Sequence, residues 1–66
     1  MNSVEFPEPY VKAVKNIESA DFDTAIKYLD LTISDFKDSQ FFHQALILKS
    51  ILYRAKLQSY ININEN

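Results

Sequence analysis

The sequence has 66 residues, no cysteine, no glycine and a net charge of −2 at pH 7. A chain of this length forms one domain at most and buries only about 60% of its unfolded surface, and the missing cysteines exclude a disulfide framework and a thiolate metal site. Seven Lys and Arg against nine Asp and Glu, without a basic block, argue against electrostatic binding to nucleic acid.

The amino terminus carries neither the positive region nor the apolar region of a secretory signal. The longest uninterrupted apolar run is Ala45–Leu48, which is far short of the roughly 20 residues that a transmembrane helix needs. We therefore expect a soluble chain in the cytoplasm, with no membrane partner.

The absence of glycine favours helices over sheets. Tight two-residue hairpins usually need Gly or Asn at positive φ, and no Asn-Gly or Asp-Gly pair occurs in this chain. Both prolines lie near the start, at Pro7 and Pro9, so the following 57 residues carry no strong helix breaker. We predict an all-α fold, a three-helix array in which an antiparallel helical hairpin is followed by a third, long helix.

The first helix is expected to begin at Pro9, because proline is well tolerated at the first helical position. An apolar stripe of helical period follows at Tyr10, Val14 and Ile17. Residues 19–20 should end this helix, and Asp21 is a suitable N-cap for the next one. So short a connection predicts that the two helices pack antiparallel.

The second helix is predicted from Phe22 to about Ser34. Its apolar residues follow the helical period at Phe22, Ala25, Ile26, Leu29 and Ile33. Residues 34–39 are rich in turn and capping residues, and Phe36 among them is expected to cover the end of the hairpin core. Asp38 or Ser39 should cap the third helix.

The third helix, expected over residues 38–60, is apolar around most of its circumference. One stripe holds Phe42, Ala45, Leu46 and Tyr53, a second holds Phe41, Leu48, Leu52 and Ala55, and the arc is widened by Ile47 and Ile51. A helix of this kind is normally buried between others, yet two short helices can cover only part of it. Residues 61–66 are expected to fray, because Asn and Ile are mediocre helix formers.

The segment Ala20-Asp21-Phe22-Asp23-Thr24-Ala25-Ile26 resembles the turn into helix B of a tetratricopeptide repeat, which has a Gly-Asp-Tyr-Asp-Glu-Ala-Ile type of sequence. On this basis residues 9–37 resemble one repeat and residues 43–60 resemble the start of a second. Phe22 and Tyr60 lie 38 residues apart, a little more than the family's usual period of about 34. The family's glycines are replaced by Ala13, Ala20 and Ser50. An unrelated three-helix bundle stays open as the alternative.

The resemblance implies protein–protein binding by helix-lined surfaces, without a cofactor and without catalytic residues. No second helix B follows in this sequence, so part of the third helix would meet water at a cost of about 1.5–3 kcal/mol per large side chain. We hypothesise that a second copy or a partner helix covers this surface; a longer parent repeat protein stays open. The candidate partner-binding residues are Phe41, Ile47, Leu48, Ile51 and Tyr28. Of these, Tyr28 and Phe41 are expected to be partially exposed.

The polar residues indicate neither an enzyme site nor a metal site. His43 is the only histidine, and no further nitrogen or sulfur ligand is present to complete a metal site with it. The aspartates fall mainly at caps and turns. The serines have no base beside them that could activate a nucleophile. We therefore predict no catalysis and no small-molecule substrate. Lys49, Arg54 and Lys56 give the third helix a weakly basic face. This leaves a second hypothesis, a small helical regulator that binds nucleic acid or inhibits an enzyme.

Overall fold

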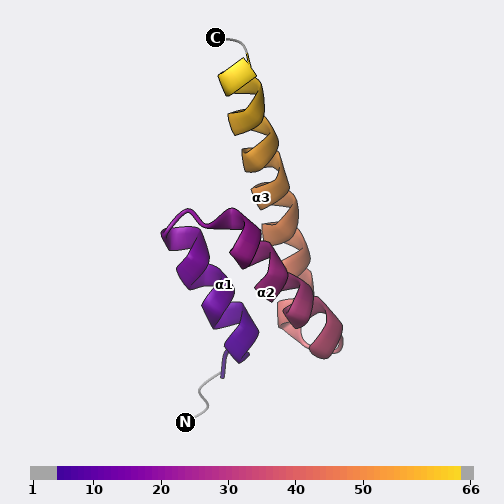
Figure 1. The fold of residues 1–66 in the computed structure, drawn as a ribbon. Coiled ribbons are helices and arrows are strands. Elements are labelled where there is room, and N and C mark those ends of the chain that lie inside the picture. Colours follow the sequence, from indigo (N-terminus) through magenta and orange to yellow (C-terminus); the bar gives the residue numbers. More distant parts are fainter. Residues whose placement is uncertain (1–4, 65–66) are drawn as a thin grey trace.

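Three helices make up the fold in the computed structural model, which describes the backbone of residues 5–64 and the side chains of residues 5–61 (Figure 1). They are α1 (Glu8–Glu18), α2 (Phe22–Asp35) and α3 (Gln40–Asn64). No strand occurs between residues 5 and 64. The prediction of an all-α, three-helix array is therefore confirmed.

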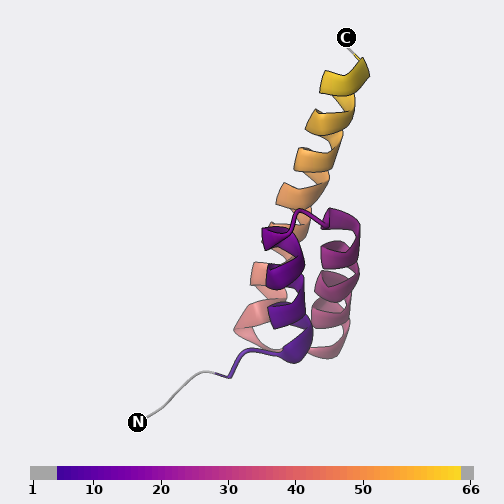
Figure 2. The same ribbon diagram turned by 60° about the vertical axis from the view of Figure 1, so that its left-hand side comes forward.

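The first two helices form an antiparallel hairpin, and α3 runs back along α2 (Figures 1 and 2). The central helix α2 therefore packs against both of the others. The longest helix is α3, with 25 residues, or about 38 Å at 1.5 Å per residue. Its carboxyl-terminal part projects past the connection between α1 and α2 (Figure 2), which gives the molecule an elongated outline of 53 × 20 × 18 Å.

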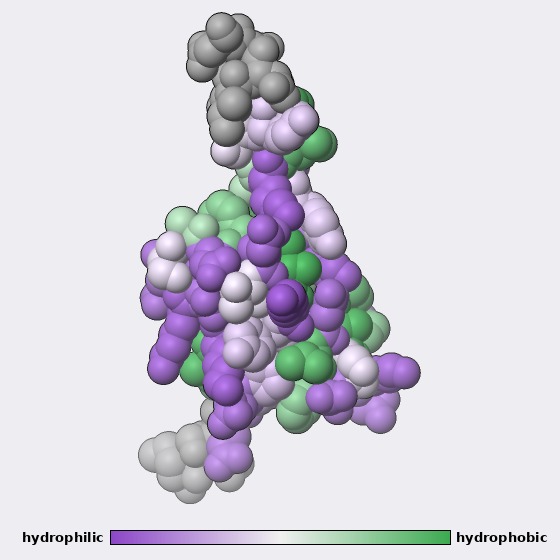
Figure 3. Space-filling model, viewed as in Figure 1, coloured by the Kyte–Doolittle hydropathy of each residue, from purple (hydrophilic) through white to green (hydrophobic). Residues whose placement is uncertain are grey.

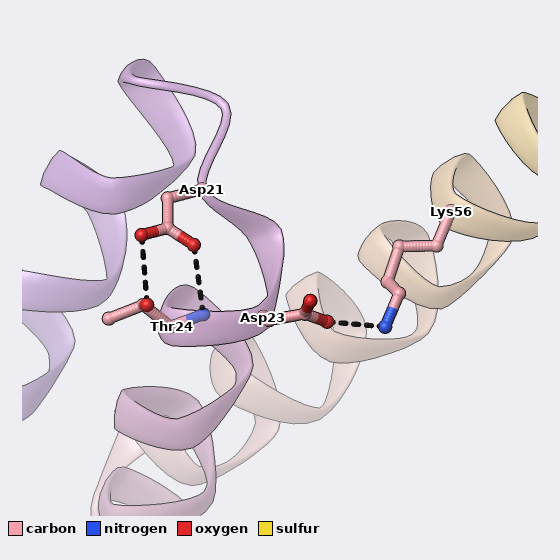
Figure 4. Close-up of polar contacts among 4 residues, drawn as sticks. All are labelled: Asp21, Asp23, Thr24 and Lys56. Atoms are coloured by element: carbon pink, nitrogen blue, oxygen red, sulfur yellow. Dashed lines mark hydrogen bonds and ion pairs between the residues drawn. The ribbon is translucent and has the colours of Figure 1, made fainter.

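The connection between α1 and α2 serves both helices at once. The backbone N–H of Asp21 donates to the oxygen of Asn16 at 2.8 Å, and that of Ala20 donates to the oxygen of Ile17 at 2.9 Å, which is the Schellman pattern of helix ends. Ala20 has φ = 63°, the left-handed conformation that glycine normally supplies. The Asp21 carboxylate accepts from the Thr24 backbone N–H at 3.3 Å and from its hydroxyl at 2.9 Å (Figure 4). The predicted N-cap is confirmed.

The connection between α2 and α3 is closed by Ser39. Its hydroxyl oxygen accepts from the backbone N–H of Phe41 at 3.2 Å and also donates to the backbone oxygen of Phe36 at 3.0 Å. The backbone N–H of Phe36 donates to the oxygen of Thr32 at the end of α2, at 3.0 Å. Of the two residues considered as the cap of α3, Ser39 therefore has this role, and the half-buried Phe36 lies between the two helix ends.

Small residues bring the three helices together in the core. The residues without any exposed surface are Ala13, Ala25, Leu29, Thr32 and Ala45. Each helix thus contributes one alanine, and a small side chain at a crossing allows a close approach of the helix axes. The Thr32 hydroxyl donates to the backbone oxygen of Tyr28 at 2.9 Å, so the buried polar group of the core is satisfied.

An aromatic cluster joins α1 to the start of α3. The ring of Phe41 lies 5.0 Å from that of Phe6 and 5.2 Å from that of Tyr10, measured between centroids. Phe41 is consequently buried, with 8% of its surface exposed, and the expectation that it is partially exposed is wrong. The physical reason is Phe6, which precedes α1 and folds over this ring. Phe6 itself remains largely exposed.

The helix α3 is longer than expected. It continues to Asn64, so residues 61–64 of the segment that was expected to fray are helical, while residues 65–66 lie outside the described part. Asn and Ile each lower helix stability by less than about 0.7 kcal/mol, and this stretch contains no Gly or Pro. A helix that is already nucleated can therefore propagate through it.

Candidate protein-docking surface on α3

Across the described residues, no group of three or more His, Cys, Asp and Glu side chains is placed to hold a metal ion. Every buried side-chain nitrogen or oxygen among them has a hydrogen-bond partner. None of the helices between residues 5 and 64 combines the length and the apolar content that a membrane crossing needs. The notable feature of this molecule is therefore an apolar surface rather than a polar site.

Exposed apolar side chains are concentrated on α3. Ten large hydrophobic residues with described side chains are exposed, and only Phe6, Val11 and Leu31 of these lie outside α3. The α3 members, which are 42–67% exposed, are Leu46, Ile47, Ile51, Tyr53, Leu57, Tyr60 and Ile61. In the view of Figure 3, apolar surface on the projecting part of α3 is visible at its edge, beside hydrophilic residues. This distribution follows from the fold, because α2 covers only one side of a helix that is apolar nearly all round.

Six of the seven exposed apolar residues of α3 form two groups, and the seventh, Ile61, falls between the directions of the two. The buried side faces α2 through Ala45 and Leu52. At about 100° per residue, four exposed residues fall on one flank of that side, and we call them the tyrosine stripe: Leu46, Tyr53, Leu57 and Tyr60. Ile47 and Ile51 fall on the other flank, roughly 130° away around the helix axis. The two groups therefore face different directions.

The structure brings together only two of the five residues proposed from the sequence. Ile47 and Ile51 are exposed one turn apart, with 54% and 53% of their surfaces free. Leu48 is half-buried and packs against the core, and Phe41 lies in the aromatic cluster. Tyr28 is also half-buried against the core, and its ring lies 5.6 Å from the ammonium nitrogen of a lysine of α1. Tyr28 is therefore not part of the α3 surface.

Two ion pairs border the tyrosine stripe. The Lys49 ammonium lies 2.6 Å from the Asp30 carboxylate of α2, and Lys56 pairs with Asp23 (Figure 4). Hydrogen bonding to Asp30 raises the pKa of Lys49, and hydrogen bonding to Asp23 raises that of Lys56. The two ammonium nitrogens lie 5.9 and 6.0 Å from the ring centroid of Tyr53, within the range of cation–π attraction. The Tyr53 ring is thus held by two lysines that are themselves bound to α2.

A shallow apolar hollow lies next to this ring. Its lining residues are Tyr53, Lys56, Leu57 and Tyr60. Leu57 and Tyr60 are 62% and 67% exposed and lie on the part of α3 that extends past the Asp23–Lys56 pair. The four residues are spaced i, i+3, i+4 and i+7 on one helix, so the hollow is the open space between neighbouring side chains into which a side chain of a packing helix can insert.

Sequence reasoning missed the tyrosine stripe as a surface. Leu46 and Tyr53 were assigned to a stripe of the third helix that also contains the buried Ala45, although these residues are 42% and 51% exposed. Two signals in the sequence mark this flank. Leu46, Tyr53 and Tyr60 recur at intervals of seven residues, and Lys49 and Lys56 follow the same interval beside them.

Comparisons with protein-family models, with curated proteins and with solved structures give no match for this chain.

Proposed function

We propose that this chain is a protein–protein interaction module of tetratricopeptide-like type, which docks a second copy or a partner helix on the outer face of α3. The observation that carries this proposal is the set of seven large apolar side chains that α3 exposes. We also propose a cytoplasmic location, which agrees with the cysteine-free composition.

The size of this surface supports a docking role. The seven side chains expose about 750 Å² in total, if a large side chain has about 200 Å² of surface. The tyrosine stripe accounts for about 450 Å² of this on one flank, which is within the range of about 300–600 Å² for the largest apolar patch of a typical monomer, a patch that is often functional. Leaving so much apolar surface in water is costly for a domain whose total stability is only about 5–15 kcal/mol.

The connection between α1 and α2 supports the tetratricopeptide-like character. In that family a glycine stands where this chain has Ala20, and Ala20 adopts the left-handed conformation, with φ = 63°, that such a glycine would supply. Asp21 caps the helix that follows. A hairpin with this turn, followed by a third helix antiparallel to α2, is the arrangement expected of one repeat and the first helix of the next.

The alternative function, binding to nucleic acid or inhibition of an enzyme by a basic face, has weaker support. Lys49 and Lys56 are already engaged by Asp30 and Asp23 of the same molecule, which reduces the charge that α3 offers to phosphates. Salt separates the two functions, because apolar association strengthens with sulfate or phosphate salts, whereas phosphate binding weakens as salt rises.

The proposed function is tested by the mass of the protein in solution. We expect the wild-type chain to sediment above the monomer mass of 7.7 kDa as its concentration rises to high micromolar. At least one of the variants Ile51→Glu and Leu57→Glu, which test the two flanks of α3 separately, should lower that mass without loss of far-UV helicity. Leu31→Glu is the matched control, since it makes the same change at an exposed leucine of α2. A folded wild-type monomer at high micromolar concentration, or dissociation by Leu31→Glu alone, would contradict the proposal.

A further inference from the structure

We propose that the tyrosine stripe binds a second copy of this chain, with the two α3 helices antiparallel and related by a two-fold axis at Tyr53. This inference rests on the proposed function of α3 as a docking surface. It adds the occupant, the flank of the helix that is used, and the register of the two helices.

The spacing of the stripe fits a two-fold axis. A two-fold interface must be self-complementary, so each residue faces the symmetry-related position of the other chain. Leu46 and Tyr60 lie seven residues on either side of Tyr53. Antiparallel helices centred on Tyr53 therefore place Leu46 against the partner's Tyr60 at both ends, with the two Tyr53 rings at the centre. At both ends a smaller leucine thus faces a larger tyrosine, which favours close packing there.

The projecting end of α3 gives such a partner access. Leu57 and Tyr60 lie beyond the part of α3 that α2 covers, and they line the hollow beside Tyr53 together with Lys56. In the antiparallel register, the projecting end of each helix lies along the Leu46 region of the other copy. The projecting end of each chain therefore covers the part of the other chain's stripe that the other chain's hairpin leaves exposed. Two copies are sufficient to cover both stripes.

The charges beside the stripe permit two copies to approach. Residues 40–64 contain three Lys and Arg and no Asp or Glu, so two bare α3 helices would repel each other. Lys49 and Lys56, which border the stripe, are paired with Asp30 and Asp23 of their own chain. These pairs reduce the repulsion across the axis and hold Tyr53 in place before contact, which lowers the entropy lost on association.

The area of the stripe is sufficient for a small dimer. Its four side chains are 42%, 51%, 62% and 67% exposed, which corresponds to about 450 Å² of apolar surface at about 200 Å² per side chain. Apolar atoms make up about 60% of a typical interface, so about 450 Å² of apolar surface corresponds to an interface that buries about 750 Å² per chain. Stable interfaces bury about 800 Å² per partner. Ile47 and Ile51 alone, two side chains one turn apart, offer less than half of the area of the stripe.

Single-cysteine variants test the register directly, because the natural chain contains no cysteine. A disulfide forms only when the two Cα atoms approach within about 7 Å. We expect Tyr53→Cys, at the axis, to give a covalent dimer in high yield under mild oxidation, at twice 7.7 kDa. Ile51→Cys is the matched control, with a similar exposure of 53% on the other flank, and should remain monomeric on a non-reducing gel.

A second pair of variants leaves Tyr53 in place. Leu46→Cys and Tyr60→Cys should each fail to cross-link alone, since each residue is displaced from its symmetry mate by about 21 Å along the axis at 1.5 Å per residue. Mixing the two variants should restore the covalent dimer. A parallel pair of helices would give the opposite result, with each variant cross-linking to itself and little gain on mixing.

The outcomes separate this inference from the proposed function. We expect Leu57→Glu to weaken the association at least tenfold and Leu31→Glu to leave it within twofold of wild type. The inference is overturned if Ile51→Glu abolishes association and Leu57→Glu does not. It is also overturned if Ile51→Cys cross-links and Tyr53→Cys does not. Either result leaves α3 as a docking surface. A wild-type chain that stays monomeric at high micromolar concentration overturns both.

Discussion

Lys56 of α3 forms an ion pair with Asp23 in the first turn of α2, 33 residues earlier in the chain (Figure 4). The pair lies where the two helices part and α3 begins to project. Asp23 is also suited to its place because the amino-terminal end of a helix favours negative charge. One carboxylate thus lies at the start of α2 and also contacts α3 where that helix begins to project.

We predict that the coupling between Asp23 and Lys56 is small and sensitive to salt, because both side chains are substantially exposed. A double-mutant cycle with Asp23→Asn and Lys56→Met, followed by urea denaturation, measures the coupling free energy. It should be favourable at about 0.01 M salt and fall to near zero at about 1 M. A coupling that stays constant over this range would show that the pair is not electrostatic in origin.

The two lysine pairs predict a loss of stability in alkali. Hydrogen bonds to Asp30 and Asp23 raise the pKa values of Lys49 and Lys56 above the ordinary lysine value of 10.5. A group whose pKa is raised by folding stabilises the fold below its unfolded pKa, and this contribution disappears as the pH rises through the folded pKa. We therefore expect the free energy of unfolding to be level below about pH 10 and to fall above about pH 10.5.

Urea denaturation at a series of pH values checks this expectation. The control is the double variant Asp23→Asn/Asp30→Asn, which retains both lysines and all tyrosines but lacks the two acceptors. Its stability should fall less steeply in alkali than that of wild type. Parallel curves for the two proteins would show that the two ion pairs are not the cause of the alkaline loss.

We predict that Ala20→Gly stabilises the protein by about 0.5–1 kcal/mol. Ala20 has φ = 63°, a conformation that costs an L-residue about 1–2 kcal/mol. Glycine removes this cost, but the larger entropy of glycine in the unfolded chain offsets part of the gain in stability. Ala13→Gly is the control, because Ala13 lies inside α1 without exposed surface. That variant should be destabilised by about 1 kcal/mol. Equal effects of both substitutions in thermal unfolding would contradict the strained turn.

The core of α2 predicts an unequal response of two leucines. Leu29 is 0% exposed and Leu31 is 46% exposed on the same helix. Leu29→Ala should cost about 3 kcal/mol, as is common for buried leucines, which is a large part of the stability of so small a domain. Leu31→Ala should cost less than about 1 kcal/mol. Chemical denaturation followed by circular dichroism measures both, and similar costs would mean that Leu29 is not at the centre of packing.

Local features of this fold were predictable from the sequence, whereas the features that depend on distant contacts were not. Asp21 and Ser39 cap helices through atoms two or three residues away, so residue type and spacing were sufficient. The burial of Phe41 depends on Phe6, 35 residues away, and no periodicity reports such a contact. The exposure of Ile47 and Ile51 was anticipated because α3 has more apolar surface than two helices can cover.

The tyrosine stripe was not predicted for a related reason. Apolar periodicity locates the apolar residues of α3 but does not determine which of its sides faces α2. That choice depends on the crossing of the two helices, with Lys49 bound to Asp30 and Leu52 buried between them. Once this side is known, Leu46 and Tyr53 must lie outside the contact.

The projecting turns of α3 lie past the end of the hairpin (Figure 2), so in a lone chain they depend mainly on their own backbone hydrogen bonds, and short unsupported helices are marginal in water. Amide hydrogens after Leu57 should accordingly be the first of α3 to exchange with deuterium in dilute solution. Any molecule that settles on this region would slow that exchange, so the isotope uptake of a few terminal turns reports whether the surface is occupied.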